Sequence, residues 1–404
     1  MDRVIVVGGG LAGVRAVEAL RGRGYRGALT LVSAERHEPY DRPPLSKAVL
    51  AGETDDTTVD ADWARLDCEL LLGERATGLR LADAGGGTLA TTAGELPFGG
   101  LVIATGATPV TLPGDGPQHV LRTIDEARDL RDRLVPGARV VIVGAGWIGA
   151  EVATTAAKKG CRVTVVEAAD TPLANAVGPE IGALTAPWYA EAGVELRTGV
   201  KVAAVEPGGL ALGDGTRIDA DEIVVGVGVR PEVEWLAGSG LDVERGVVTD
   251  ASFRTSAGGA PRPDVVAVGD CAAYWSHRYG RRLLVEHWDT ALNAPEVAAA
   301  ALLGEDAVYD APPYFWSEQF GRMVQYAGQH ARSERMLHRG DPADGKWAVA
   351  WLTGDRLDAI LTVDRPRDLV QAKRVIAAGT PVDAALLADP AVPVRQALNV
   401  GGFE

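Results

Sequence analysis

The sequence has little cysteine, which limits the redox chemistry that the chain itself can perform. Its 404 residues include three cysteines, Cys68, Cys161 and Cys271. They lie far apart and form no CxxC or CxxxxC pair, so the chain lacks a redox-active disulfide of the dithiol-reductase kind. Structural disulfides are not expected in a reducing compartment. We expect all three to be small buried side chains.

Long apolar runs are also missing. No stretch reaches the roughly 18 apolar residues that a membrane-spanning helix needs. The N-terminus passes from Met1 and two charged residues directly into strand-like residues Val4–Val7, without a basic leader or a cleavage site. We therefore expect no signal peptide, no membrane partner and a cytoplasmic location.

Positive charge is in deficit, and the formal net charge is −15. This argues against nucleic acid and against an anionic membrane surface as partners. It leaves open an acidic protein partner that docks on a local basic patch. The six histidines form no HxxxH or HExxH set, so we expect no metal site. A monomer and a homodimer are both compatible with this composition.

Glycine, in contrast, is abundant, and its most informative pattern is Gly8-x-Gly10-x-x-Gly13. This pattern follows the predicted strand Val4–Val7 and begins a predicted helix. Glycines here permit a tight turn and let the backbone approach a pyrophosphate at the helix N-terminus. Glu35 stands about 20 residues further on, where a carboxylate binds ribose hydroxyls. The segment therefore predicts a Rossmann-type dinucleotide-binding fold.

A second copy of the same pattern begins at Gly144 and continues with Gly146 and Gly149, after a predicted strand at 139–143. Glu167 occupies the position of the ribose-binding acid. A carboxylate there accepts hydrogen bonds from the ribose 2′-hydroxyl of NADH and repels the 2′-phosphate of NADPH. The three residues after it include no arginine that would hold a phosphate. The second unit is thus expected to prefer NADH.

The remaining elements point to an α/β protein with a smaller α+β region at its end. Further strands are expected at 28–33, 88–92, 95–98, 101–104, 161–166, 194–212, 222–229, 264–269, 315–327 and 348–363. Helices are expected at 290–303, with Pro295 near the first turn or interrupting the helix, and at 367–378.

Several short motifs make the chain similar to one flavoprotein family. Ala104-Thr105-Gly106 and the late Val268-Gly269-Asp270 are typical of two-dinucleotide flavoprotein reductases. Narrower motifs are RPPLSK at 42–47, GWIGAE at 146–151, GVGVRP at 226–231 and FWSEQ at 315–319. With these motifs, the sequence resembles the putidaredoxin reductase-like ferredoxin reductases of oxygenase systems over nearly its whole length.

The resemblance implies the fold and the activity of the chain. The fold is α/β, with a split FAD-binding domain at 1–112 and 239–307, an NAD-binding domain at 113–238 and a C-terminal α+β interface domain at 308–404. The expected activity passes electrons from NADH through FAD to an iron–sulfur ferredoxin of the 2Fe–2S or 3Fe–4S type. That ferredoxin in turn supplies a monooxygenase cytochrome or a ring-hydroxylating dioxygenase.

The resemblance also implies roles for single residues. Lys47 is expected beside flavin N5, paired with Glu151 from the second helix, and these two are the candidate catalytic residues. Arg42 is expected along the FAD pyrophosphate, and Asp270 at the ribityl chain and the N-terminus of a helix. The other implied cofactor-binding residues are Gly8, Gly10, Ala12, Gly13, Glu35, Ala76, Ala104, Thr105, Gly106, Arg122, Gly144, Gly146, Ile148, Gly149, Glu167, Gly228, Trp288 and Trp316.

Structural roles are the alternative for several of these residues. Taken alone, Lys47 reads as an exposed loop lysine and Glu151 as a helix-surface acid. For Trp288 and Trp316 the alternative is a role as core or interface aromatics. Trp147 is bulky, and it either packs between two domains or hinders nicotinamide stacking.

Two other classes of function remain open. One is an NADH oxidase or a disulfide or coenzyme A reductase, which uses a reactive cysteine beside the flavin, although no cysteine stands within 42–47. The other is an NADH-responsive interaction protein similar to apoptosis-inducing factor. The absence of basic clusters disfavours that second class.

Overall fold

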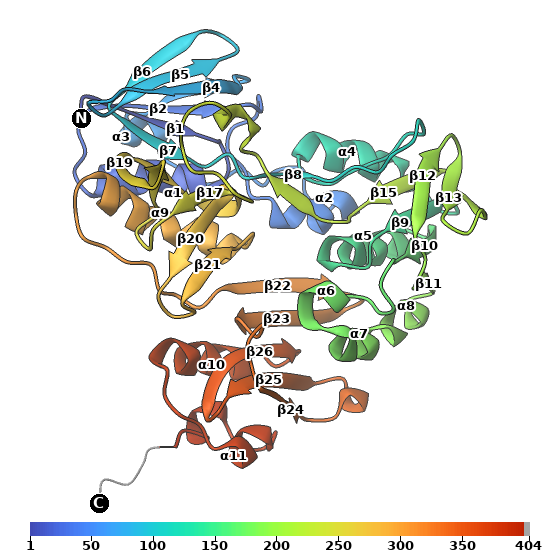
Figure 1. Ribbon diagram of the computed structural model, residues 1–404. Coiled ribbons are helices and arrows are strands. Elements are labelled where there is room, and N and C mark those ends of the chain that lie inside the picture. The colour runs from blue at the N-terminus through green and yellow to red at the C-terminus, as the bar shows by residue number, and fades with distance from the viewer. Residues whose placement is uncertain (400–404) are drawn as a thin grey trace, which may run out of the picture.

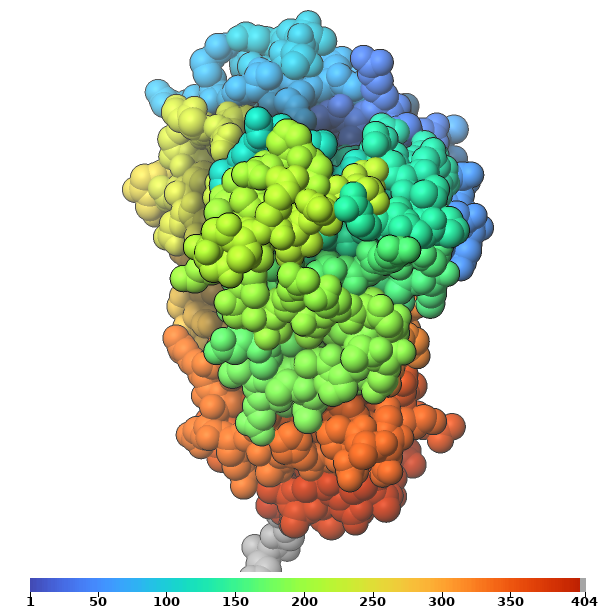
Figure 2. Space-filling view, turned by 90° about the vertical axis from the view of Figure 1, so that its right-hand side faces the viewer, coloured from blue at the N-terminus to red at the C-terminus, as the bar shows by residue number. Residues whose placement is uncertain are grey.

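The computed structural model describes residues 1–399, which form three units, each built around its own β-sheet (Figure 1). The N-terminal unit contains a nine-stranded sheet, the central unit a four-stranded sheet and the C-terminal unit a five-stranded sheet. The space-filling view shows the central unit, in green, facing the viewer above the C-terminal unit, in orange and red (Figure 2). No helix within residues 1–399 is long and apolar enough to cross a membrane.

The nine-stranded sheet is assembled from two stretches of chain that are far apart in sequence. Its strands are β1 (Arg3–Val7), β2 (Ala28–Ser33), β3 (Glu69–Leu72), β7 (Gly100–Ile103), β17 (Val247–Thr249), β18 (Arg254–Ala257), β19 (Ala260–Ala267), β20 (Ala272–Ser276) and β21 (Arg281–Leu284). Their spatial order is β21-β20-β17-β18-β19-β7-β1-β2-β3. β1 pairs in parallel with β2 and β7, and Val4, Ile5 and Val6 are fully buried. A continuous apolar run suits a central parallel strand that is covered on both faces.

Two helices and a small antiparallel sheet complete this unit. α1 (Leu11–Gly22) packs against α9 (Trp288–Leu302), whose row of buried alanines lets the helix axes approach closely. A three-stranded meander consists of β4 (Ala76–Leu81), β5 (Gly87–Thr91) and β6 (Glu95–Phe98). The short helices are η1 (Pro43–Ser46), α2 (Ala48–Ala51), α3 (Trp63–Leu66), η2 (Glu234–Leu236) and η3 (Gly269–Cys271).

The central unit repeats the parallel arrangement on a smaller scale. Its sheet has the order β11-β10-β9-β15, from β9 (Arg139–Val143), β10 (Arg162–Val166), β11 (Glu195–Arg197) and β15 (Glu222–Val225). A three-stranded antiparallel sheet adds β12 (Val202–Glu206), β13 (Gly209–Leu212) and β14 (Arg217–Asp219). The helices are α4 (Ile124–Arg133), α5 (Trp147–Lys158), α6 (Ala174–Val177), α7 (Pro179–Thr185) and α8 (Pro187–Glu191). β8 (Ala107–Pro109) and β16 (Val229–Pro231) pair where the chain passes between this unit and the N-terminal one.

The C-terminal unit is an antiparallel sheet covered by a helix. The order is β22-β23-β26-β25-β24, from β22 (Tyr314–Gln319), β23 (Arg322–Gly328), β24 (Arg335–Arg339), β25 (Trp347–Thr353) and β26 (Arg356–Val363). Its helical segments are α10 (Pro366–Ala378), α11 (Ala384–Ala388), η4 (Pro342–Asp344) and η5 (Val394–Gln396). The apolar face of α10 packs on β26 through Leu369, Ala372 and Ile376.

The α/β fold class expected from the sequence is confirmed, and the boundaries of several elements need correction. α9 starts at Trp288 and accommodates Pro295 inside the helix, so this proline neither ends the helix nor lies in its first turn. Asp270, predicted at the N-terminus of a helix, lies in the first turn of the one-turn helix η3, which continues into strand β20. The predicted strand 222–229 ends at Val225, and Val229 already belongs to β16.

The glycine turns are required by close backbone contacts. Gly8 has a positive φ of 120°, and a Cβ added to it would lie 2.1 Å from the carbonyl oxygen of Ala104. A Cβ on Gly13 would lie 1.9 Å from the carbonyl oxygen of Gly8. Gly149 has the same relation to Gly144, again at 1.9 Å. The last glycine of each motif therefore lets the helix pack onto the preceding turn.

Substitutions at two glycines of the first motif should differ in their effect on stability. Gly13→Ala should lower the free energy of unfolding by about 1–3 kcal/mol, because its Cβ has to displace backbone. Gly10→Ala should change it by less than about 0.5 kcal/mol, since an added Cβ meets no described atom within 4 Å. Urea unfolding of both variants measures this difference, and equal losses would contradict the packing role of Gly13.

Candidate active site

A cleft of about 1200 Å³ lies where the three units meet. Both glycine turns open into it. Gly10 and Gly146 line the cleft, and an added Cβ at either position would meet no described protein atom within 4 Å. Each turn thus presents bare backbone at a helix N-terminus to open space, as an incoming pyrophosphate requires.

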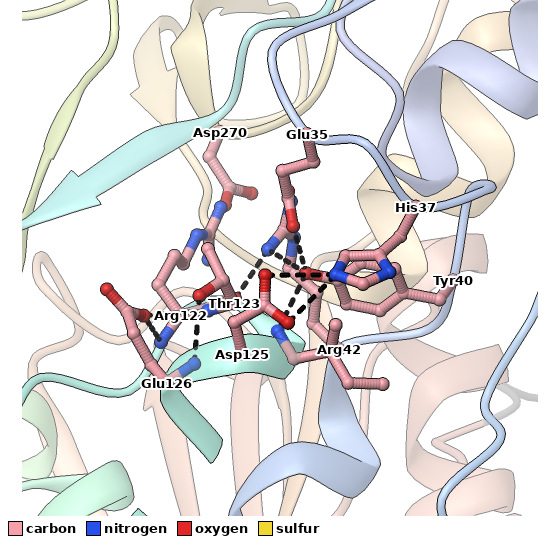
Figure 3. Close-up of polar contacts among 10 residues, drawn as sticks. Glu35, His37, Tyr40, Arg42, Arg122, Thr123, Asp125, Glu126 and Asp270 are labelled. Atoms are coloured by element: carbon pink, nitrogen blue, oxygen red, sulfur yellow. Dashed lines mark hydrogen bonds and ion pairs between the residues drawn. The ribbon is translucent and has the colours of Figure 1, made fainter. Parts of the chain in front are cut away.

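Glu35 at the end of β2 is held by two neighbouring side chains (Figure 3). Its Oε1 accepts a hydrogen bond from Arg42 Nη2 at 2.7 Å, and its Oε2 accepts one from the Tyr40 hydroxyl. The Arg42 guanidinium also stacks over the Tyr40 ring and donates to the backbone carbonyl of Arg122. Burial raises the pKa of the Tyr40 phenol well above its usual value, so the phenol remains a donor. Two residues predicted to hold different parts of FAD thus form one cluster.

A second ion pair, between Arg122 and Asp270, lies next to this cluster. Arg122 Nη2 donates to Asp270 Oδ2 at 2.7 Å (Figure 3). Arg122 itself is positioned by its backbone, because its N–H donates to Glu126 Oε2 at 2.9 Å. Glu126 forms a capping box with Thr123 at the start of α4. The turn before α4 therefore fixes an arginine that reaches from the central unit to Asp270.

Lys47 and Glu151 form an ion pair, with Nζ and Oε2 2.7 Å apart. Glu151 on α5 is 4% exposed and Lys47 is 20% exposed. Ser46 donates to the same Oε2, and Ser317 Oγ donates to Oε1 at 2.7 Å. A buried carboxylate is tolerated when its oxygens are satisfied in this way. The reading of Lys47 as a free loop lysine and Glu151 as a surface acid is wrong.

Glu167 lies against the second glycine turn. Its Oε2 accepts a hydrogen bond from the Ala145 N–H at 2.7 Å, and its Oε1 accepts one from the Ala169 N–H at 2.8 Å. The carboxylate faces the same cleft as Gly146 and Ile148. Backbone donors therefore fix a negative charge at the position predicted to select against a phosphate.

Aromatic side chains border the cleft on the side of α9. Trp288 Nε1 donates to Asp41 Oδ1 at 2.7 Å. The rings of Trp288 and Trp316 meet edge to face with centroids 5.6 Å apart, and Trp316 stacks on Tyr314 at 6.1 Å. Both tryptophans line the cleft. The polar edge of Trp288 is used to fix its ring, which leaves its apolar surface for contacts.

A second aromatic group joins the three units. Trp147 meets the edge of Phe315 at 4.6 Å, and Phe315 contacts His287 at 4.7 Å. Trp147 therefore packs between the central and C-terminal units. Burial lowers the pKa of His287 to about 4, so the imidazole is neutral at pH 7. His287 lines the cleft, and its buried Nδ1 has no hydrogen-bond partner among residues 1–399.

Most residues predicted for the site come together in this one cleft. The cleft-lining ones are Gly8, Gly10, Ala12, Glu35, Arg42, Lys47, Ala76, Ala104, Thr105, Gly106, Arg122, Gly144, Gly146, Ile148, Glu151, Glu167, Gly228, Asp270, Trp288 and Trp316. Gly13 and Gly149 are not among them, since they lie beneath their turns and act through packing. Sequence reasoning missed Tyr40, Asp41, Ser46 and Ser317 as partners, although three of these stand in or beside recognised motifs.

The three cysteine thiols are unreactive in character. Burial raises the pKa of Cys68 to about 11, and it also raises the pKa values of Cys161 and Cys271. All three are free thiols, and none lines the cleft. Cys271 is buried as expected, but the expectation is wrong for Cys68 and Cys161, which are half-buried. A protonated thiol is a poor nucleophile.

Two protein-family models match the chain. Residues 2–295 match the pyridine nucleotide-disulphide oxidoreductase model, and residues 314–398 match the reductase C-terminal model. The chain belongs to the pyridine nucleotide-disulphide oxidoreductase family. The name of this family refers to disulphide substrates, but this oxidoreductase carries no cysteine pair.

Named relatives show which members of this family the chain is similar to. The oxidoreductase is 38% identical over 414 residues to the anthranilate 1,2-dioxygenase system ferredoxin–NAD(+) reductase component of Burkholderia cepacia, covering 98% of each chain. It superimposes on the crystal structure of Fdr9 with a TM-score of 0.92 and 47% identity, over 98% of this chain and 99% of that one. The reductase in the covalent putidaredoxin reductase–putidaredoxin complex matches with a TM-score of 0.93 and 33% identity, over 100% and 99% of the two chains. The predicted resemblance to ferredoxin reductases is confirmed.

The position of Glu167 allows a test of cofactor choice. Glu167→Gln should narrow the preference for NADH over NADPH, because it removes the charge that repels a 2′-phosphate. The preference of the unchanged protein and of the variant is measured as the ratio of flavin bleaching rates with each cofactor. Glu195→Gln on the outer strand β11 is a matched control and should retain the original ratio. A preference of the unchanged protein for NADPH would contradict the charge argument.

Proposed function

We propose that this oxidoreductase transfers electrons from NADH, through bound FAD, to an iron–sulfur ferredoxin that serves an oxygenase. The observation that carries the proposal is the buried Lys47–Glu151 pair, set in one cleft between two dinucleotide-type glycine turns. The names of the relatives support the same activity, since one is the ferredoxin–NAD(+) reductase component of a dioxygenase system and another is a putidaredoxin reductase.

FAD fits the first glycine turn and the cluster beside it. Bound FAD supplies the redox chemistry, taking two electrons from a nicotinamide and releasing them singly to a one-electron acceptor. Gly10 and Ala12 would admit its pyrophosphate, and Arg42 would neutralise that charge. Glu35 would hold the ribose, and Asp270 the ribityl chain. The unpartnered Nδ1 of His287 is a further polar group that a bound cofactor would satisfy.

NADH fits the second turn by the same argument. Gly144 and Gly146 open the backbone to a pyrophosphate, and Glu167 supplies a fixed carboxylate for the ribose. Ile148 and Gly228 line the adjoining wall of the cleft. Trp147 packs against Phe315, which sets one boundary of the space left for a nicotinamide ring.

Lys47 is the electrostatic element of the proposed reaction. Its ammonium lines the cleft and is held by a buried carboxylate, so it need not reorganise during electron transfer. A fixed cation stabilises negative charge that develops nearby in a water-poor site. Glu151 positions the ammonium and offsets the cost of its partial burial.

The proposal also covers the acceptor class, the cellular location and the domain limits. We assign the acceptor to the class of 2Fe–2S or 3Fe–4S ferredoxins and the protein to the cytoplasm. The domain limits that we propose are 1–112 and 239–307 for FAD, 113–238 for NAD and 308–404 for the interface domain, of which residues 400–404 lie outside the described part of the chain. The continuity of the nine-stranded sheet across the first two segments supports the split FAD domain. The direct test is NADH-driven reduction of 2Fe–2S and 3Fe–4S ferredoxins by the purified protein, and failure to reduce ferredoxins of both types would contradict the proposal.

Lys47 and Glu151 provide a mutational test of the mechanism. Lys47→Met should retain FAD, because other residues hold the ADP half. It should slow flavin reduction at saturating NADH by an amount equivalent to about 3 kcal/mol in the barrier, since a charge-stabilising group is lost. Glu151→Gln should have a smaller effect of the same sign, and the double variant should be less than additive. Stopped-flow bleaching measures all three, and simple addition of the two effects would remove the pair from the mechanism.

A triple cysteine variant tests whether a thiol takes part in the reaction. Replacing Cys68, Cys161 and Cys271 together with Ala should leave NADH-dependent ferricyanide reduction largely unchanged, since all three thiols are held protonated and outside the cleft. Activity per bound FAD is the quantity to compare. A loss of activity with FAD still bound would favour a disulfide-type reductase instead.

A further inference from the structure

Glu151 is held from the C-terminal unit as well as from the N-terminal one. Its Oε2 accepts hydrogen bonds from Lys47 and Ser46, whereas its Oε1 accepts one from the hydroxyl of Ser317 at 2.7 Å. Ser317 belongs to β22 and is 0% exposed. The carboxylate therefore sits at a point where all three units meet, and each of its oxygens is fixed by a different unit.

The proton of the Ser317 hydroxyl has a defined direction. Gln319, 1% exposed, donates its Nε2 to Ser317 Oγ at 3.2 Å. A serine oxygen that accepts one hydrogen bond is left to donate its own hydrogen elsewhere, and the acceptor in reach is Glu151 Oε1. The two hydrogen bonds therefore run in one direction, from Gln319 through Ser317 to the carboxylate of Glu151.

Strand geometry explains why β22 can supply this chain. Alternate residues of a strand point to opposite faces, so Phe315, Ser317 and Gln319 share one face. That face contacts Trp147 and Glu151 of the central unit. The other face carries Trp316, which contacts Trp288 of the N-terminal unit. A second contact, from the backbone N–H of Phe320 to Thr154 Oγ1 at 2.9 Å, fixes the end of β22 on α5.

We propose that Ser317, oriented by Gln319, is a positioning residue that fixes the Glu151 carboxylate so that its second oxygen holds Lys47 in the cleft. The inference rests on the proposed function, because it assigns Lys47 its electrostatic role there. Without the Ser317 hydroxyl, Oε1 becomes an unsatisfied buried carboxylate oxygen, and the carboxylate rotates or draws in water. Lys47 then loses its fixed position, and the negative charge of Glu151 is less well compensated.

The test compares Ser317→Ala with a matched serine in the same unit. Ser333 Oγ donates to Asp358 at 2.9 Å, and Asp358 also receives Thr353 and Arg356, so it has one cation and two hydroxyl partners as Glu151 does. None of these four residues lines the cleft. Ser333→Ala thus removes a hydrogen bond from a serine hydroxyl to a carboxylate away from the site, where Asp358 Oδ2 keeps its bond from Thr353.

Three quantities are measured on the FAD-loaded proteins: FAD content, flavin reduction at saturating NADH and the flavin midpoint potential. Ser317→Ala should keep its FAD, reduce about tenfold more slowly and show a more negative midpoint potential, as expected when one hydrogen bond to a charged group is lost. Ser333→Ala should match the unchanged protein in all three. Ser317→Thr, which restores a hydroxyl, should recover both rate and potential.

Two outcomes would overturn the inference. One is a Ser317→Ala protein with the original rate and potential. The other is an equal loss of rate when Ser317→Ala is made in a Lys47→Met background, because a residue that acts through Lys47 has no effect once Lys47 is gone. If Ser317→Ala does not fold, Gln319→Met replaces it, since it removes the donor that orients Ser317 at similar volume, and the same criteria apply. Failure of the proposed function would look different, since NADH would then leave the unchanged protein unreduced.

Discussion

The buried carboxylate of Glu151 is the interaction on which the candidate active site depends. It sits on α5 of the central unit, pairs with Lys47 of the N-terminal unit and accepts from Ser317 of the C-terminal unit. An ionised carboxylate that is 4% exposed is stable only when its partners are all in place. The three units therefore have to meet in one arrangement for this group to be satisfied. The contacts that satisfy Glu151 and hold Lys47 in the cleft therefore also constrain how the three units pack together.

The second constraint is the close approach of backbone at the two glycine turns. Gly8 meets Ala104, and Gly144 meets Gly226, with a Cβ on the glycine only 2.1 and 2.4 Å from the facing carbonyl oxygen. Each turn is thereby tied to the neighbouring strand end of its own sheet. This leaves the middle glycine of each motif facing the cleft with free space in front of it. The same three-glycine spacing thus serves packing at its ends and ligand access at its centre.

Much of this arrangement was predictable from the sequence because it is local. The strand, glycine turn, helix and acid of each dinucleotide unit follow from residues close together in the chain, and the structure has them where the pattern places them. The Lys47–Glu151 pair was predicted only through the resemblance to a family, since nothing in the residues themselves joins positions so far apart. Helix α9 was misjudged because proline was treated as a local breaker. Burial of its alanine face against α1 stabilises the helix enough to include Pro295.

The partners of single side chains were the least predictable part, and they decide what each acid does. Glu35 is compensated by an arginine and a phenol, Glu167 by two backbone N–H groups and Glu151 by a lysine and two hydroxyls. The first acid is thus charge-balanced by Arg42 beside the first glycine turn, where we propose that it holds a ribose. The second keeps its carboxylate towards the cleft, where we propose that its charge selects between two nicotinamide cofactors. The third pairs with a lysine, through which we propose that it acts. Three glutamates of the same intrinsic chemistry thus differ in their proposed tasks because different neighbours hold them.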